Sequence, residues 1–374
     1  MLRKLAFAAL AVTLGFALLE LAARGVELVR PSAAVDYGLG FAEGSRVFAA
    51  DPERPGGFVT APEKRRFFLI TSFDRAKPAG ALRVGAVGGS SVRYADDELQ
   101  AMGASLSAAA GRPVEMINAG ALGYGSHRVV LVARELLDYD LDALLVYSGH
   151  NEFEEVEQLA LSAPPAGALQ AGLAQHSAFF RVLRDAITAA QVGVLQREHN
   201  AKLLDARPAQ ARAWNHPFTP EDVAERMAAY ERNLRLIAAM AADAGVPLVI
   251  GTVPSNHYRP TLPPAVRADF MPIFRAYQRG EWQEAGPRAS AFLAATLGRH
   301  QSSDVENAII RRVAAERGVR LADVETRVRS AEPHGVLGET MFRDHCHLNA
   351  RGNGIWRETF EPEVAAALGV PFPH

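Results

Sequence analysis

Short apolar runs that end in glycine or small polar residues constrain the fold of this chain most. Three of them, Leu82–Val87, Pro113–Asn118 and Leu141–Tyr147, have the length of buried strands. The stretches that follow the first two, Asp96–Ala110 and His127–Leu137, have the pattern of helices. Because parallel strands need a long crossover between them, strands that alternate with helices indicate a parallel sheet. The sequence therefore predicts an α/β domain.

Two later apolar runs extend this pattern. Pro247–Val253 and Arg320–Val324 are predicted to be the fourth and fifth strands. We expect a three-layer α/β/α domain with a flavodoxin-like parallel sheet over residues 80–374. In such a sheet the carboxyl ends of the strands meet at one edge, where ligands bind. Polar blocks that follow different strands are therefore expected to lie together.

Two stretches exceed this minimal pattern. Residues 154–220, which follow the third strand, are rich in Ala and Leu and are predicted to form a helical lid over the site. Residues 268–300 contain Phe270–Leu297, which is predicted to form a helical hairpin. A single hairpin cannot be a repeat array, because such arrays need about three units. Both stretches are therefore interpreted as insertions into one domain.

The first polar block is Gly88-Gly89-Ser90-Ser91, at the end of the first strand. Glycines allow the backbone to turn tightly and to present a hydroxyl at the surface. Acyl transfer through a covalent intermediate needs such a hydroxyl as its nucleophile. The same residues also suit an ordinary helix start, in which Ser90 or Ser91 caps the helix.

Two blocks offer hydrogen-bond donors. Asn118-Ala119-Gly120-Ala121-Leu122-Gly123 follows the second strand, and Gly149-His150-Asn151-Glu152 follows the third. A glycine lets the backbone approach a substrate, and an asparagine amide donates without titrating. These blocks can therefore supply an oxyanion hole, although a turn or loop explains each block equally well.

The last block is Asp344-His345-Cys346-His347. A histidine can take a proton from a serine and return it to a leaving group, and a carboxylate can orient the ring. The Asp-x-x-His spacing of Asp344 and His347 favours these roles. A polar surface loop and a metal site that includes His345 are the alternatives.

In number and order these four blocks resemble the SGNH, or GDSL-type, hydrolase family. The version with Gly149-His150-Asn151-Glu152 resembles a bacterial, membrane-anchored branch of that family. The resemblance implies Ser90 as the nucleophile, His347 as the base and Asp344 as its partner. It also implies an oxyanion hole formed by Ser90, Gly123 and Asn151. Gly89 stands where the family commonly has Asp.

Four residues near the blocks are candidates for substrate binding: Arg93, Tyr124, His150 and Glu152. Each is as well explained by a role in the fold. No cofactor and no metal is required by the predicted chemistry.

The N-terminal segment, residues 1–30, is predicted to be a membrane anchor. Arg3 and Lys4 precede Leu5–Ala23, which spans about 28 Å as a helix and so approaches the thickness of a bilayer core. Basic residues before the span favour a single-pass protein of the bacterial inner membrane with a periplasmic domain. A signal peptide cleaved after Ala17 is the alternative. Residues 31–79 are interpreted as a linker and N-terminal extension.

The net charge of -2 argues against nucleic acid as a partner, because phosphate binding needs a basic surplus. The expected function is serine-dependent ester hydrolysis through an acyl-enzyme. An acylated envelope glycan or lipid is the expected substrate, on the basis of the predicted location alone. An SGNH-type O-acyltransferase and a non-catalytic envelope assembly protein are the alternatives.

Overall fold

The computed structural model describes residues 2–29, 46–159, 177–180, 182, 183, 186 and 217–372. The chain divides into two compact units, Met1–Ser45 with Leu159–Ala213 and Arg46–Gln158 with Trp214–His374. The second unit contains the sheet and all the predicted site residues.

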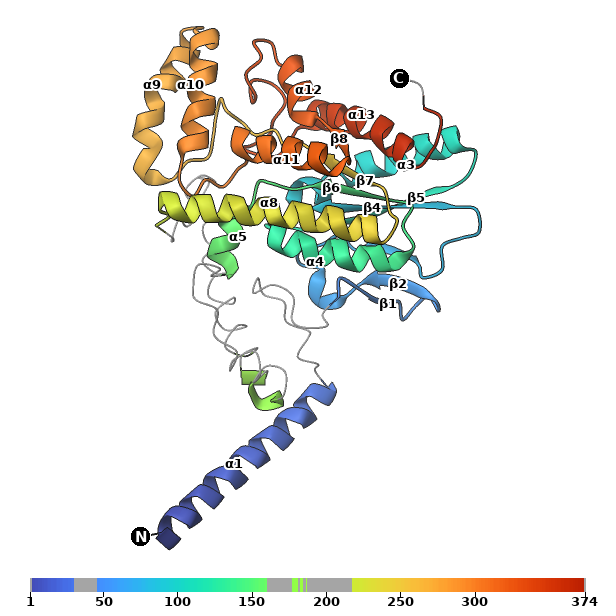
Figure 1. Cartoon of the computed structure of the whole chain (residues 1–374), viewed down its shortest axis with the longest axis vertical. Helices are drawn as coiled ribbons and strands as arrows, with labels where there is room; N and C mark the ends of the chain where they lie inside the picture. The colour runs from blue at the N-terminus through green and yellow to red at the C-terminus, as the bar shows by residue number, and fades with distance from the viewer. Residues whose placement is uncertain are drawn as a thin grey trace. The chain divides into compact units, whose positions relative to one another are not determined.

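The centre of the second unit is a five-stranded parallel sheet with the order β5-β4-β6-β7-β8 (Figure 1). The strands are β4 (Leu82–Gly88), β5 (Val114–Gly120), β6 (Ala143–Tyr147), β7 (Leu248–Gly251) and β8 (Arg320–Ala322). The chain therefore visits the sheet in the flavodoxin-like order, and the five predicted strands and the α/β class are confirmed. The order reverses around β4, so the predicted ligand position lies at the ends of β4, β5 and β6.

Helices cover both faces of this sheet. Figure 1 shows α3 (Asp96–Ala110) and α13 (Ala350–Ala367) on one side and α4 (Ser126–Leu136) and α8 (Pro220–Asp243) on the other. A third helix, α11 (Asp304–Arg317), packs on α8. Every residue of β4 and β6 is buried, as expected for strands covered on both faces. The shorter helices of the unit are α2 (Ser90–Arg93), α5 (Glu152–Leu159) and α12 (Val324–Ala331).

Glycines allow close packing where β4 and β5 end. A Cβ atom on Gly88 would lie 2.0 Å from the carbonyl oxygen of Tyr147, and one on Gly120 would lie 2.2 Å from the amide nitrogen of Arg93. Any larger residue would push the neighbouring backbone away. Because both positions are glycine, the backbone segments around the predicted site can pack in direct contact.

Part of the predicted linker, residues 31–79, is instead a small sheet within the second unit. Strands β1 (Phe48–Ala50), β2 (Gly57–Thr60) and β3 (Ser72–Asp74) pair antiparallel. The amides of Val47 and Phe48 donate to the Glu135 carboxylate on α4 at 2.6 and 3.0 Å. These contacts fix the small sheet to the helical layer.

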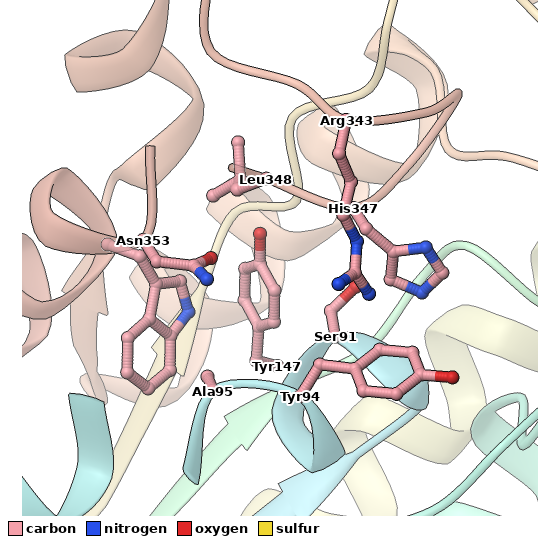
Figure 2. A pocket seen from close by; sticks show the side chains of 9 residues that line it. Ser91, Tyr94, Ala95, Tyr147, Arg343, His347, Leu348 and Asn353 are labelled. Carbon is pink, nitrogen blue, oxygen red and sulfur yellow. The ribbon is translucent and has the colours of Figure 1, made fainter. Parts of the chain in front are cut away.

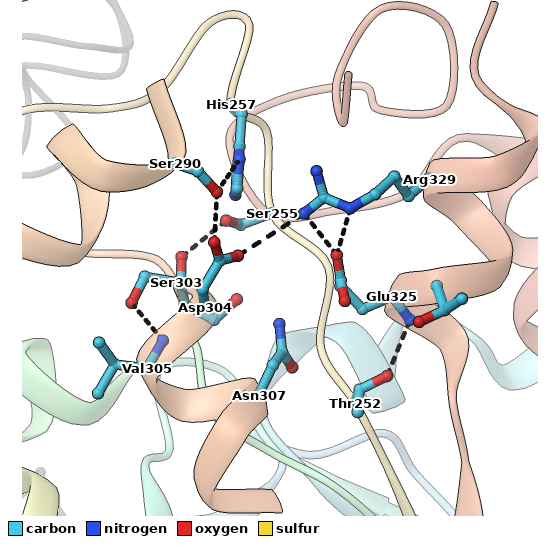
Figure 3. A network of polar contacts seen from close by, with 12 residues as sticks. Thr252, Ser255, His257, Ser290, Ser303, Asp304, Val305, Asn307, Glu325 and Arg329 are labelled. Atoms are coloured by element: carbon cyan, nitrogen blue, oxygen red, sulfur yellow. Dashed lines mark hydrogen bonds and ion pairs between the residues drawn. The ribbon is translucent and has the colours of Figure 1, made fainter. Parts of the chain in front are cut away.

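The predicted helical hairpin is present as α9 (Arg267–Gln278) and α10 (Trp282–Ala295). Its two helices share an apolar cluster that includes Phe270, Tyr277 and Leu293. Polar contacts attach it to the sheet domain, as Figure 3 shows: Ser290 on α10 donates to Asp304 at the start of α11 and lies 3.5 Å from His257 Nδ1. Burial lowers the pKa of His257 to about 4, so this ring is neutral at neutral pH. The hairpin is therefore attached to α11 through Ser290 and Asp304, next to the neutral ring of His257.

The first unit contains α1 (Leu2–Val29). The Glu20 carboxylate accepts hydrogen bonds from the Ser177 hydroxyl and from the amides of Ala178 and Phe179. Within the described residues, no helix combines the length and the apolar character that a membrane crossing needs. The structure therefore does not support the transmembrane span predicted at Leu5–Ala23. Most of the predicted lid, residues 154–220, lies outside the described residues.

Candidate active site

Ser90 is the first residue of α2, directly after β4. Gly89, before it, has extended backbone with φ -80° and ψ -158°. A Cβ atom on Gly89 would lie 2.6 Å from the side-chain nitrogen of Asn151. The glycine found where the family commonly has Asp therefore lets the Asn151 amide lie against the backbone that leads to Ser90.

Ser90 belongs to an unbroken hydrogen-bonded chain of three side chains. His347 Nε2 lies 2.7 Å from Ser90 Oγ, and His347 Nδ1 lies 2.7 Å from Asp344 Oδ2. With the proton on Nδ1, the ring donates to Asp344 and accepts from the Ser90 hydroxyl. The structure thus brings Ser90 to a pair of residues on a loop more than 250 positions later, with the geometry of a Ser-His-Asp triad.

Asp344 is held in its charged state. Burial alone would raise its pKa, but the hydrogen bond and charge of His347 and the amides of Cys346 and His347 outweigh burial. The pKa of Asp344 therefore lies well below its ordinary value. The carboxylate remains ionised at neutral pH and can stabilise a protonated ring on His347.

The loop that carries the triad histidine is fixed from outside by Asn256. The Asn256 side-chain amide donates to the Asp344 carbonyl at 3.0 Å, and its backbone amide donates to the His345 carbonyl at 2.9 Å. His345 is buried and contacts Asp344 at 3.7 Å. The two histidines of the block therefore have different environments, and His347 lies 2.7 Å from the serine hydroxyl.

The three predicted oxyanion donors come from the segments after β4, β5 and β6. One hydrogen of the Asn151 amide goes to the Tyr124 carbonyl at 3.0 Å, which fixes the amide and leaves its other hydrogen. In the described part of the chain, the amides of Ser90 and Gly123 have no recorded acceptor. Gly123 has φ +71°, a conformation that favours glycine. This arrangement fits an oxyanion hole made by Ser90, Gly123 and Asn151.

A buried carboxylate holds the Gly123 loop in place. Glu155 accepts from the amides of Gly125, His127 and Arg128 at 3.0, 3.0 and 3.2 Å. It also pairs with the Arg128 guanidinium at 2.8 Å, and Arg128 in turn donates to the Gly123 carbonyl at 2.6 Å. These amides belong to the start of α4, where negative charge is favourable. The loop that carries one oxyanion donor is thus bound at several points.

A second buried carboxylate links this loop to α8. Glu152 accepts from the amide and the hydroxyl of Ser126, both at 2.8 Å. The Arg226 guanidinium reaches Glu152 at 2.6 Å and Glu155 at 2.8 Å. Burial raises the pKa of Glu152 although Arg226 opposes it. Burial would also raise the pKa of Glu155, but the charges of Arg128 and Arg226 outweigh burial and lower this pKa.

Three of the four candidate substrate-binding residues are buried. Tyr124 is 1% exposed, His150 5% and Glu152 0%. The His150 ring accepts from the Ser302 amide at 3.3 Å. Their environments fit roles in the fold, and substrate contact by these side chains stays a prediction. Arg93 is half-buried and lies near Tyr94, with its guanidinium carbon 5.5 Å from that ring.

A shallow pocket lies beside the triad histidine (Figure 2). His347, Tyr94 and Arg343 are among its nine lining residues. Tyr94 packs edge-on against His347, with 5.1 Å between ring centroids. The sequence analysis did not single out Tyr94 or Arg343, although each lies four positions from a triad residue. That spacing is the only signal that pointed to them.

The triad loop also contains ligand types that suit a metal. Polar atoms of Asp344, Cys346 and His347 lie within 4.8 Å of one another. The Asp344 and His347 atoms in this group already bind each other, and His347 also binds Ser90. The observed hydrogen bonds therefore fit proton transfer better than coordination.

Comparisons with known proteins gave structural likenesses only. No family model matches the chain, and no curated relative was found. An acetyl xylan esterase is 12% identical with a TM-score of 0.42, covering 76% of this chain and all of its own. A GDSL-like lipase from Bacteroides thetaiotaomicron is 11% identical with a TM-score of 0.38, covering 76% of this chain and 88% of its own. An esterase from a Pseudoalteromonas species is 12% identical with a TM-score of 0.38, covering 77% and 98%.

Because these TM-scores lie below 0.5, the likenesses carry no argument about chemistry. In the order of its four blocks, and in their positions after β4, β5 and β6 and in the loop before α13, this chain resembles the SGNH, or GDSL-type, hydrolase family.

Proposed function

We propose that the protein is a serine-dependent ester hydrolase that acts through an acyl-enzyme. The observation that carries the proposal is the chain of two 2.7 Å contacts from Ser90 through His347 to Asp344. The amides of Ser90 and Gly123 and the Asn151 side chain stand next to it as donors. A nucleophile, a base with its orienting group and an oxyanion hole are the parts that acyl transfer needs.

The first half of the reaction forms the acyl-enzyme. His347 Nε2 takes the hydroxyl proton of Ser90 while Oγ bonds to the ester carbonyl carbon. The carbonyl oxygen becomes an oxyanion held by the three donors. The bond to the alcohol oxygen then breaks, and His347 returns the proton to that oxygen. The alcohol leaves, and the acyl group remains on Ser90.

The second half releases the acid. Water gives a proton to His347 while its oxygen bonds to the acyl carbon, and the bond to Ser90 Oγ then breaks with return of the proton. A sugar hydroxyl in place of water would give acyl transfer by the same steps. Acyl transfer to a sugar is therefore one alternative to hydrolysis. A non-catalytic role in envelope assembly is the other, and the experiment must distinguish both from hydrolysis.

The substrate class and the location are part of the proposal. Arg3 and Lys4 before the apolar run Leu5–Leu19 support an N-terminal signal or anchor that places the enzyme in the periplasm. An acylated envelope glycan or lipid is the substrate class that this location would offer.

The test is turnover of short p-nitrophenyl esters by the full chain in detergent. We expect hydrolysis that Ser90→Ala lowers by roughly a thousandfold or more, because the covalent step is lost. The melting temperature of the variant shows that the fold persists. Added sugar acceptors that take the acyl group would identify a transferase. Equal turnover by the wild type and Ser90→Ala would contradict the proposal.

A further inference from the structure

The pocket beside His347 carries no negative charge in its lining. Its nine lining residues are Ser91, Tyr94, Ala95, Tyr147, Arg343, His347, Leu348, Asn353 and Trp356. Its enclosed part is small, about 10 Å³ or room for one water molecule, and its other side opens to solvent. Figure 2 shows the Arg343 side chain directed into this space, between Tyr94 and the His347 ring. A guanidinium group at this place offers several donors and a positive charge to any group that enters.

Two arginines, Arg343 in the lining and Arg93 nearby, stack against the Tyr94 ring and form no ion pair with a described carboxylate. The guanidinium carbons of Arg343 and Arg93 lie 4.5 and 5.5 Å from the centroid of the Tyr94 ring. Among the described residues, no carboxylate forms an ion pair with either one. Asp344 is bound to His347, and Glu98 on α3 pairs with Arg357. Two guanidinium groups therefore stand near the triad without an ion-pair partner among the described residues.

A buried donor in the same lining lacks an acceptor. Trp356 is 1% exposed, and its buried indole nitrogen has no hydrogen-bond partner among the residues that the structure describes. An indole N–H can only donate, so an oxygen-bearing ligand is what would satisfy it. Buried donors in folded proteins normally have partners. The unpaired indole and the unpaired guanidinium groups point to the same kind of ligand.

The position of the pocket identifies which part of a substrate would enter it. His347 Nε2 must give its proton to the leaving alcohol oxygen, so the alcohol lies against His347 in the reaction. The oxyanion donors Gly123 and Asn151 come from other strand ends and hold the acyl carbonyl. A substrate group that binds at the open side of the pocket beside His347 thus belongs to the alcohol.

We propose that an anionic oxygen group, a carboxylate or a phosphate, on the alcohol part of the ester substrate binds at the open side of this pocket, against the exposed Arg343. The inference rests on the proposed esterase function and adds a substrate class to it: acyl esters of acidic alcohols, such as acidic sugars. Arg343 supplies the main contact, because a charged guanidinium binds such oxygens through paired hydrogen bonds.

The test compares esters that differ in charge alone. The substrates are 3-acetoxybenzoate, 3-acetoxyphenyl phosphate and the neutral 3-acetoxybenzamide, and the quantity is kcat/KM for the full chain. We expect the wild type to prefer one or both anionic esters. Arg343→Gln should lower kcat/KM for the preferred anionic ester about tenfold, the size of one charge-assisted hydrogen bond, and for the amide less than twofold. Arg343→Lys should retain part of the preference.

Arg232→Gln is the matched control, because it removes one exposed charge from α8. It should leave all three rates unchanged. The relative response to carboxylate and phosphate distinguishes the two anion types. An equal effect of Arg343→Gln on charged and neutral esters, or no preference in the wild type, would overturn the inference and leave the esterase function standing.

A binding measurement separates the two proposals if no ester is hydrolysed. In that case the esterase function has failed, and the melting temperature is measured with 3-hydroxybenzoate, 3-hydroxyphenyl phosphate or 3-hydroxybenzamide. The inference predicts that an anionic compound raises the melting temperature, that the amide does not, and that Arg343→Gln removes the rise. Equal shifts with charged and neutral compounds, or no shift, would overturn it independently.

Discussion

At the scale of single residues, small changes in position decide the role of chemically identical groups. His345 and His347 lie two residues apart in one loop, yet His347 bonds to Ser90 and Asp344 while His345 is buried beside Asn256. The Asp-x-x-His spacing predicted this difference, because only His347 has a carboxylate three residues before it. The burial of Tyr124, His150 and Glu152 was not visible in the sequence, since the polar partners of these side chains come from other elements.

The two histidines give a matched pair of variants. We expect His347→Gln to lower the hydrolysis of p-nitrophenyl acetate by roughly a thousandfold or more, because Ser90 loses its base. His345→Gln should retain most of the activity if its melting temperature is unchanged. A chelator should leave the wild-type rate unchanged. Loss of activity with chelator, restored by zinc, would indicate the metal alternative at Asp344, Cys346 and His347.

At the scale of elements, the sequence was most informative where a strand is long and apolar. β4, β5 and β6 were predicted because they are apolar runs that end in glycine or small polar residues. β1 and β3 were not predicted, because Pro, Gly and charged residues surround their few apolar positions. The small sheet is attached to Glu135 on α4, which lies more than 80 positions later in the chain. A contact between such distant residues is not visible in a local sequence pattern.

The buried charges between α4, α5 and α8 give a prediction about stability. Glu155 is fully buried against Arg128 and Arg226, so Glu155→Gln leaves positive charge without its partner. We expect a loss of about 3–5 kcal/mol in the free energy of unfolding. Glu231→Gln, which breaks an exposed pair with Arg312, should cost about 1 kcal/mol or less. Denaturant unfolding of both variants measures the difference.

The effect of Glu155→Gln should also depend on pH. The pKa of Glu155 is lowered in the folded state, so its stabilisation is present above its unfolded pKa and is lost as the pH falls through its folded pKa. The gap between the wild type and Glu155→Gln should therefore narrow in acid. Equal costs for the Glu155 and Glu231 variants at neutral pH would show that the buried network does not hold the oxyanion loop.

At the scale of the whole molecule, the sheet domain and the N-terminal unit differ in how far the sequence predicts them. The class and strand order of the sheet domain follow from repeated apolar runs and crossover rules. The lid predicted over residues 154–220 lies mostly outside the described residues, and the structure leaves its role as a prediction. The predicted membrane role of α1 rests only on the sequence of residues 3–23.

The location of the chain can be measured directly in a bacterium. If residues 1–30 are an anchor, the full chain should remain with the inner membrane after carbonate washing, and protease added to the periplasm should digest the sheet domain. Replacement of residues 1–30 by a cleavable signal peptide should release the protein in soluble form. A mature wild-type protein that begins at Leu18 would show that the segment is a signal peptide.

The central claim is that Ser90 is the nucleophile of an acyl-enzyme, and its reaction with a fluorophosphonate tests this claim most directly. Mass spectrometry of the digested protein should find the phosphonyl group on Ser90, because His347 activates that hydroxyl alone. The label should be absent from Ser90→Ala and from His347→Gln. A label on Ser91, or equal labelling of the wild type and His347→Gln, would contradict the account.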